Sequence, residues 1–142
     1  MQKVISHNEE DTRELGMKLG KNLKKGDIVC LVGDLGSGKT LLSQSIAKAL
    51  GVDEEVTSPT FTIIHEYMGK ELPLYHFDVY RINHPDEMFE IGLEEYLFGE
   101  GICLIEWADK IEEYIPEDRI MIMIQRGQAD QERIIHIEGI EI

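Results

Sequence analysis

Residues 33–40, with the sequence GDLGSGKT, constrain the fold more than any other stretch because they match the pattern G-x-x-x-x-G-K-[ST]. This pattern forms a loop between a strand and a helix, and its backbone N–H groups surround phosphate oxygens. In such a loop Lys39 reaches the β- and γ-phosphates, and the Thr40 hydroxyl binds Mg²⁺. Residues 27–32 are an apolar run typical of a buried strand, and residues 41–50 form a helical pattern. The stretch therefore predicts a nucleotide-phosphate site between these two elements.

The patterns along the rest of the chain predict strands and helices in alternation. Besides residues 27–32, strands are expected at residues 4–5, 74–80, 101–107, 120–125 and 133–140 and in the second half of residues 56–67. This order favours an α/β class, specifically a P-loop NTPase-like three-layer fold. Its central sheet would be mixed and mostly parallel, with a C-terminal antiparallel hairpin. We expect one P-loop ATPase domain over residues 1–142.

The first helix has a predicted start and end. Ser6 and Glu9 match a capping box, in which Ser6 caps the helix and Glu9 reaches back. The helix is expected to run towards Lys25, with leucines spaced four residues apart on its buried side. A second helical stretch, residues 85–98, contains Gly92, which is expected to divide it into two short helices.

Two carboxylates end predicted strands, as nucleotide hydrolysis would require. Glu106 follows the apolar run ICLI, and Asp78 follows YHF. A carboxylate at the end of a buried strand lies at the rim where open α/β sheets bind ligands. We assign Mg²⁺ first to Glu106, with Thr40. Asp78 either shares the metal or positions the attacking water, and the neighbouring His76 is the histidine expected to touch the site.

Residues 58–60, with the sequence SPT, follow the first long helix after the loop. Many phosphate-loop proteins have a switch segment at this point, which senses the γ-phosphate. The Thr60 hydroxyl would then reach metal or water. The alternative is a proline-containing turn with local hydrogen bonds.

Composition limits the kinds of partner. The net charge is −14, and an acidic chain repels nucleic acid and anionic membranes unless it has a local basic patch. The two cysteines lie in apolar runs and show no metal-binding spacing, which is typical of buried thiols in a reducing compartment. The sequence contains no spanning apolar run. We expect a cytoplasmic protein with no membrane contact, whose nucleic-acid contacts, if any, come through partners.

Four motifs together resemble a known family: GDLGSGKT, SPTFTIIHEY, YHFDVYRI and LIEWADKI. In this order and in a short chain, they resemble TsaE, formerly YjeE, from the bacterial pathway for the tRNA modification threonylcarbamoyladenosine (t6A). The resemblance extends over about residues 6–142. It implies Mg²⁺-dependent ATP hydrolysis, weak when the protein is alone, and association with TsaD and TsaB homologues. ATP and Mg²⁺ are the implied cofactors, with ADP as the product.

The resemblance also implies roles for individual residues. Phosphates would bind to the loop and its flanks: Gly33, Gly36, Ser37, Gly38, Lys39, Thr40 and Leu41. Asp78, Glu106, Lys39 and Thr60 would be catalytic, and Thr40, Glu106 and Asp78 would hold the metal. Trp107 would lie beside the nucleotide. Glu9 and Thr12 would contribute to the adenine pocket, and so, as a weaker candidate, would Arg133.

Other functions compatible with the loop lack their own signals. A small-molecule kinase of the P-loop fold is the main alternative, but its lid needs clustered arginines, and the five arginines here do not cluster after a central helix. A GTPase would carry an Asn-Lys-x-Asp motif, which the sequence lacks. A pure binding module would leave Glu106, Asp78 and Thr60 without a catalytic purpose.

Overall fold

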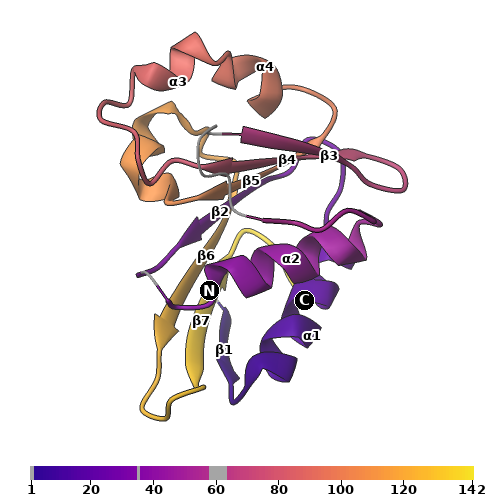
Figure 1. Ribbon diagram of the computed structural model, residues 1–142, viewed down its shortest axis with the longest axis vertical. Helices are drawn as coiled ribbons and strands as arrows, with labels where there is room; N and C mark the ends of the chain where they lie inside the picture. Colours follow the sequence, from indigo (N-terminus) through magenta and orange to yellow (C-terminus); the bar gives the residue numbers. More distant parts are fainter. Residues whose placement is uncertain (1, 35, 58–63) are drawn as a thin grey trace.

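A seven-stranded sheet forms the centre of the molecule in the computed structural model, which describes residues 2–34, 36–57 and 64–142 (Figure 1). The strands lie in the order β1-β7-β6-β2-β5-β4-β3. The elements are β1 (Gln2–Ser6), α1 (Glu9–Asn22), β2 (Ile28–Val32), α2 (Lys39–Ala49), β3 (Ile64–Met68), β4 (Pro73–Asp78), α3 (Glu87–Glu90), α4 (Leu93–Leu97), β5 (Ile102–Glu106), the 3₁₀-helix η1 (Ala108–Tyr114), β6 (Ile120–Arg126) and β7 (Arg133–Glu138).

The middle of the sheet is parallel and its edges are antiparallel. Strand β2 pairs in parallel with β5 and β6, and β5 pairs in parallel with β4. Strand β3 pairs antiparallel with β4, and β7 pairs antiparallel with both β6 and β1. The predicted fold class, including the mixed sheet and the C-terminal hairpin, is therefore confirmed.

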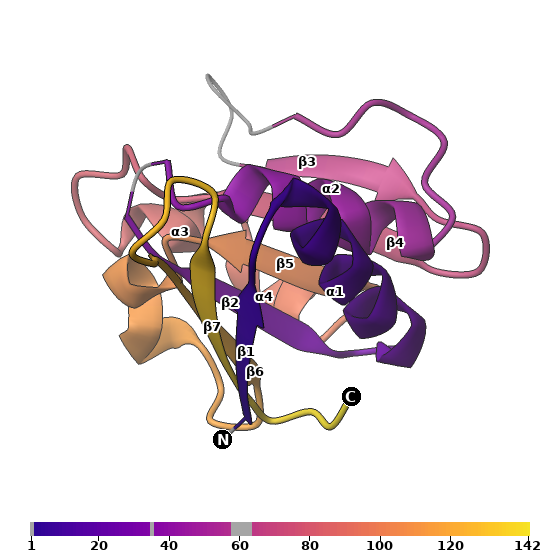
Figure 2. The same ribbon diagram turned by 90° about the horizontal axis from the view of Figure 1, so that it is seen from below.

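Helices cover both faces of the sheet (Figures 1 and 2). One apolar core lies on the side of α1 and α2, and a second lies on the side of α3, α4 and η1. Successive residues of β5 alternate between them, since Leu104 belongs to the first core and Cys103 to the second. All five residues of β5 are buried, as expected for a central parallel strand. The last residue of this strand, Glu106, is therefore buried where the strand ends.

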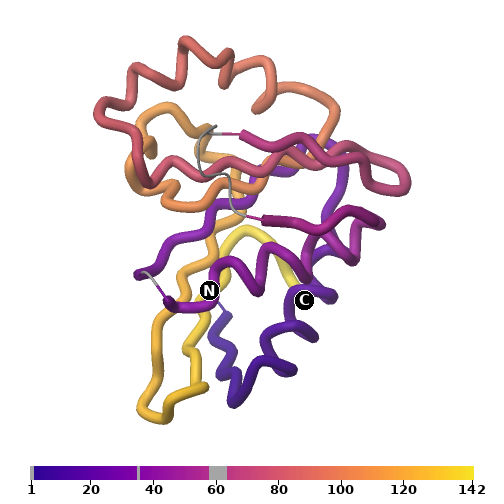
Figure 3. Tube along the Cα trace, in the orientation of Figure 1, coloured from indigo at the N-terminus to yellow at the C-terminus, as the bar shows by residue number. Residues whose placement is uncertain are grey.

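Glycines allow α1 to approach α2 closely. A Cβ on Gly16 would lie 2.4 Å from the Cβ of Ser45, and a Cβ on Gly20 would lie 2.5 Å from the Cβ of Ala49. Real Cβ atoms do not approach each other so closely. The tube in Figure 3 shows α1 beside α2, which follows the phosphate loop. The close packing brings the start of α1 to the same end of the molecule as the loop.

The predicted ends of the first helix are wrong. Ser6 is the last residue of β1, and Asn8 is the actual cap: its Oδ1 accepts a hydrogen bond of 2.8 Å from the Asp11 N–H. The helix ends at Asn22 and does not reach Lys25, because Leu23 already has an extended backbone. The division at Gly92 is confirmed: its φ of 74° is left-handed, and it separates α3 from α4.

Within the three described segments, no helix combines the length and apolar character needed to cross a membrane.

Candidate functional site

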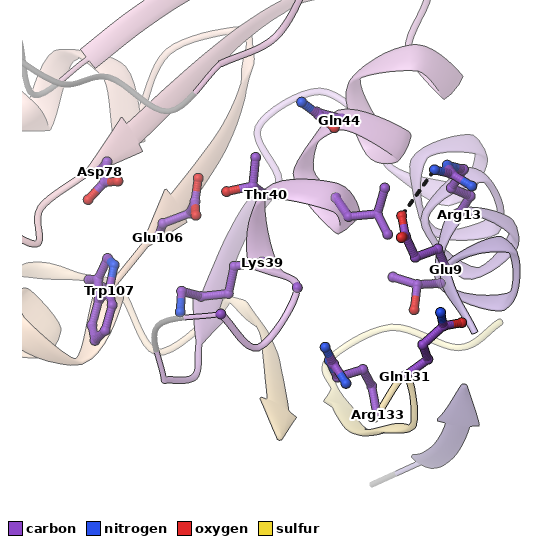
Figure 4. A pocket seen from close by; sticks show the side chains of 14 residues that line it. Glu9, Arg13, Lys39, Thr40, Gln44, Asp78, Glu106, Trp107, Gln131 and Arg133 are labelled. Carbon is purple, nitrogen blue, oxygen red and sulfur yellow. Dashed lines mark hydrogen bonds and ion pairs between the residues drawn. The ribbon is translucent and has the colours of Figure 1, made fainter. Parts of the chain in front are cut away.

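A cavity of about 600 Å³ lies where β4 and β5 end and α2 begins. Figure 4 shows its lining side chains: Asp78, Glu106 and Trp107 lie on one side of Lys39 and Thr40, and residues of α1 and the C-terminal hairpin lie on the other. The cavity is lined by Glu9, Thr12, Arg13, Gly36, Gly38, Lys39, Thr40, Leu41, Gln44, Asp78, Glu106, Trp107, Gln131 and Arg133.

The loop between β2 and α2 needs glycine at specific positions. Gly36 and Gly38 have φ angles of 75° and 104°, in the region that favours glycine. Gly33 is required for a different reason: a Cβ there would lie 2.5 Å from the carbonyl oxygen of Ile124 on β6. Helix α2 begins immediately after Gly38, and its first turn contains no acidic residue. Its positive end is therefore available to an anion in the cavity.

The Lys39 ammonium is held inside the loop. Its Nζ donates hydrogen bonds to the carbonyls of Gly33 (2.5 Å) and Asp34 (2.7 Å), and it lies 4.2 Å from the centre of the Trp107 ring. Burial lowers the pKa of Lys39, and the nearby carboxylates, Glu106 first among them, oppose this shift. Among the described residues its hydrogen-bond acceptors are both neutral carbonyls, and a cation so enclosed favours an anionic ligand next to it.

Glu106 is a buried carboxylate at the end of β5. Glu106 is 2% exposed, and its Oε2 lies 2.5 Å from Nε2 of His76. His76 comes from β4 and is 1% exposed. His76 therefore contacts Glu106, a predicted site residue, but does not itself line the cavity.

Asp78 lies directly opposite Glu106 in the pairing of β4 with β5. Its Oδ1 accepts a hydrogen bond of 3.0 Å from the Tyr80 N–H. Burial raises the pKa of Asp78, the Tyr80 N–H lowers it, and the Glu106 carboxylate raises it further. Two carboxylates thus face one cavity from neighbouring strands, as the sequence predicted.

Trp107 has an unusual backbone conformation directly after Glu106. Among the described residues it is the only one besides glycines with a positive φ, 63°. Its N–H donates to the Leu31 carbonyl at 3.0 Å, and its ring lies 4.7 Å from that of Tyr80. A left-handed conformation in a large residue is uncommon and tends to occur at functional sites. It places the indole beside the Lys39 ammonium.

The donors in the cavity suit Mg²⁺ bound together with phosphate. Thr40, Asp78 and Glu106 offer hydroxyl and carboxylate oxygens, the ligands that Mg²⁺ prefers. The part of the chain that the structure describes holds no group of three or more His, Cys, Asp or Glu residues able to bind a metal by themselves. Mg²⁺ usually takes one or two protein carboxylates and completes its shell with water and substrate phosphates. The residues therefore fit a metal that arrives with a nucleotide.

The opposite end of the cavity combines α1 with the C-terminal hairpin. Arg133 donates from Nε to the Ser37 carbonyl at 2.9 Å and from Nη1 to the carbonyls of Asp130 and Glu132, both at 2.9 Å. The bond to Ser37 therefore connects the hairpin to the phosphate loop. Glu9 and Thr12 face this end from α1.

The structure brings together most of the predicted site residues. The cavity is lined by Glu9, Thr12, Gly36, Gly38, Lys39, Thr40, Leu41, Asp78, Glu106, Trp107 and Arg133. Gly33 and Ser37 belong to the loop but are not among the lining residues; their carbonyls accept hydrogen bonds from Lys39 and Arg133. Thr60 and the rest of residues 58–60 lie outside the described residues.

Three lining residues were not predicted: Arg13, Gln44 and Gln131. Two of them follow a predicted site residue by four positions, Arg13 after Glu9 and Gln44 after Thr40. Residues four apart share a helix face, so helical spacing was a usable signal. Gln131 lies in the turn of the hairpin and had no such signal.

A mixed α/β sheet in which β2 leads through a glycine-rich phosphate loop into α2 defines a P-loop protein. Comparison with known proteins narrows this class. The family "Threonylcarbamoyl adenosine biosynthesis protein TsaE" matches residues 6–135. The chain is 46% identical over 127 residues to a Bacillus subtilis protein called tRNA threonylcarbamoyladenosine biosynthesis protein TsaE, covering 89% of this chain and 79% of that one.

A relative of the same name from Treponema pallidum is 39% identical over 135 residues, covering 95% of this chain and 98% of that one. The crystal structure of Bacillus subtilis YdiB superposes with a TM-score of 0.77 and 42% identity, covering 94% of this chain and 82% of that one. The chain belongs to the TsaE family, as its four motifs indicated.

Proposed function

We propose that this protein is a Mg²⁺-dependent ATPase that serves the t6A modification of tRNA together with TsaD and TsaB homologues. The observation that carries the proposal is the cavity itself, where Lys39 and Thr40 of the phosphate loop face Asp78 and Glu106. Membership in the TsaE family supports the pathway, because the relatives are named for threonylcarbamoyladenosine biosynthesis.

Each of these cavity residues has its own role in the proposed hydrolysis. The Lys39 ammonium exchanges its two loop carbonyls for the β- and γ-phosphates, and the first turn of α2 adds its backbone N–H groups. Thr40 and Glu106 would hold Mg²⁺, which stabilises the charge that develops on the phosphate oxygens. Asp78, one strand away from Glu106, orients the attacking water.

The far end of the cavity is suited to the nucleoside. It offers an acid, a hydroxyl and an amide from Glu9, Thr12 and Gln131, which can pair with the edge of a base or with ribose. Arg133 links this end to the phosphate loop. We infer that adenine lies between α1 and the hairpin.

The charge of the chain favours a protein partner as its route to tRNA. A net charge of −14 opposes direct binding to a phosphate backbone. Weak activity of the isolated protein and stimulation by TsaD and TsaB homologues would follow if those proteins complete the site or carry the tRNA.

The test is ATP turnover of the purified chain, measured alone and with both partner homologues. We expect slow Mg²⁺-dependent hydrolysis alone and faster hydrolysis with the partners. Absence of Mg²⁺-dependent turnover in both settings would refute the ATPase. A pull-down with TsaD and TsaB that captures nothing in the presence of ADP, ATP or no nucleotide would refute the partnership.

A further inference from the structure

We propose that His76 is a positioning residue: its imidazole fixes the Glu106 carboxylate in the orientation that receives the metal. This inference rests on the proposed function, since it assigns the metal to Glu106. His76 lies outside the lining of the cavity, so its role would be exerted through Glu106.

The sheet places the two side chains together. His76 and Asp78 are two residues apart on β4 and therefore project from the same face. In the pairing with β5, Asp78 lies opposite Glu106 and His76 lies opposite Leu104. His76 is thus diagonal to Glu106, a position from which long side chains reach each other. The resulting Nε2 to Oε2 distance is 2.5 Å.

Burial makes this contact important for Glu106. The side chains of His76 and Glu106 are 1% and 3% exposed. A buried carboxylate needs a hydrogen-bond donor to replace water. Among the described residues, His76 is the one hydrogen-bond partner of the Glu106 side chain. The bond engages Oε2 and leaves Oε1 free of His76.

The other nitrogen of the ring indicates what the imidazole is for. His76 Nδ1 is buried and has no hydrogen-bond partner within the described part of the chain. An unpaired buried polar atom is unfavourable for folding. Replacing both members of a buried charged pair by apolar residues often leaves stability unchanged, whereas removing one member alone is destabilising. Within the described residues the His76 imidazole hydrogen-bonds to Glu106 alone, so its effect is exerted through that carboxylate.

The consequence concerns metal affinity. Groups that hydrogen-bond to metal ligands orient them, and their loss typically reduces metal affinity 10- to 100-fold. Nucleotide binding without metal depends on the phosphate loop and α1, and within the described residues His76 makes no hydrogen bond to either. His76 variants should thus separate metal binding from nucleotide binding.

The experiment compares His76→Leu, which removes the donor, with His76→Gln, whose amide nitrogen lies as many bonds from Cα as Nε2 does. His136→Leu, at a half-buried histidine of β7, is the matched control. Three quantities are measured: the melting temperature, ADP affinity in EDTA from Trp107 fluorescence, and Mn²⁺ affinity with ADP present. The last is followed by the electron paramagnetic resonance signal of free Mn²⁺.

We expect His76→Leu to melt at a lower temperature, because the buried Glu106 carboxylate loses its donor, and to keep its ADP affinity in EDTA. Its Mn²⁺ affinity should fall roughly 10- to 100-fold. His76→Gln should restore most of this loss, and His136→Leu should bind Mn²⁺ as the native protein does. Native Mn²⁺ affinity in His76→Leu would overturn the inference, as would an equal loss in His76→Gln. If His76→Leu does not fold, His76→Gln decides: near-native Mn²⁺ affinity supports the inference, and a loss of roughly 10-fold overturns it. If the native protein binds no Mn²⁺ with ADP, the metal assignment fails as well. If it binds Mn²⁺ but hydrolyses no ATP, only the proposed activity fails.

Discussion

At the scale of single residues, the Lys39 ammonium already occupies the centre of the phosphate loop. It is bound there by the carbonyls of Gly33 and Asp34 and lies over the Trp107 ring. A phosphate group would offer it a stronger, charge-assisted partner.

Lys39→Ala should therefore weaken ADP binding roughly 10- to 100-fold, the equivalent of one charge-assisted hydrogen bond. Isothermal titration calorimetry measures this directly. Lys48→Ala, an exposed lysine in the last turn of the same helix, serves as the control and should bind ADP normally. Native affinity in Lys39→Ala would show that the ammonium does not reach the phosphates.

The two cysteines give a prediction about pH. Burial raises the pKa of both the Cys30 and the Cys103 thiol from 9.0 to about 12. At pH 8 roughly one thiol in ten thousand is then a thiolate, the reactive form. The native protein should not react with Ellman's reagent at pH 8, and both thiols should react after unfolding. Fast reaction of either thiol in the native protein would contradict this burial.

The same shifts fix how stability depends on alkaline pH. The folded protein holds both thiols neutral to a higher pH than the unfolded chain does. The stability they contribute is complete below about pH 9 and is lost as the pH rises towards 12. The free energy of unfolding in urea should consequently decrease over this range.

Sequence alone could locate residues whose chemistry is written into a motif or a strand end. Lys39 and Thr40 follow from the loop pattern, and Glu106 follows from the apolar run before it. The sequence could not predict the contact between His76 and Glu106, because that contact depends on the pairing of β4 with β5. Gln131 was missed because its position is set by a turn and not by a periodic pattern.

At the scale of elements, α1 reaches the site only because it packs tightly on α2. Gly16 and Gly20 make this possible, as any larger residue would collide with Ser45 or Ala49. The leucine pattern predicted which side of α1 is buried. It could not reveal that the neighbour would be α2, since the contact joins segments that are distant in the sequence.

Gly16→Val should push α1 away from α2 and destabilise the protein by about 1–3 kcal/mol, the usual cost of overpacking. ADP affinity should fall as well, because Glu9 and Thr12 leave the cavity with the helix. Urea denaturation and ADP titration measure the two effects. Lys18→Val, on the exposed side of α1, is the control. Unchanged stability in Gly16→Val would mean that α1 and α2 have room to separate.

Helix ends show how local signals can compete. Ser6 and Glu9 fit a capping box, but Ser6 is drawn into β1 by pairing with Arg133 of β7. Asn8, nearer the first helical residue, then provides the cap. The competing partner lies 127 positions along the chain, so a local pattern could not identify it.

At the scale of the whole molecule, strands, helices and a hairpin from distant parts of the chain contribute to one cavity. Strands β4 and β5 bring the carboxylates, α2 the phosphate loop, and α1 and the hairpin the far end. The succession of strands and helices predicted the fold class and its parallel centre. The pairing of β1 with β7 joins the two ends of the chain and could not be predicted from local patterns.

The central claim is that this cavity hydrolyses ATP through Glu106. The most direct test is ATP turnover by Glu106→Gln beside the native protein, with TsaD and TsaB homologues present and ADP affinity in EDTA measured in parallel. We predict that ADP affinity is retained while turnover falls roughly 100-fold or more, since metal-assisted charge stabilisation is worth several kcal/mol. Turnover at the native rate in Glu106→Gln would contradict the account.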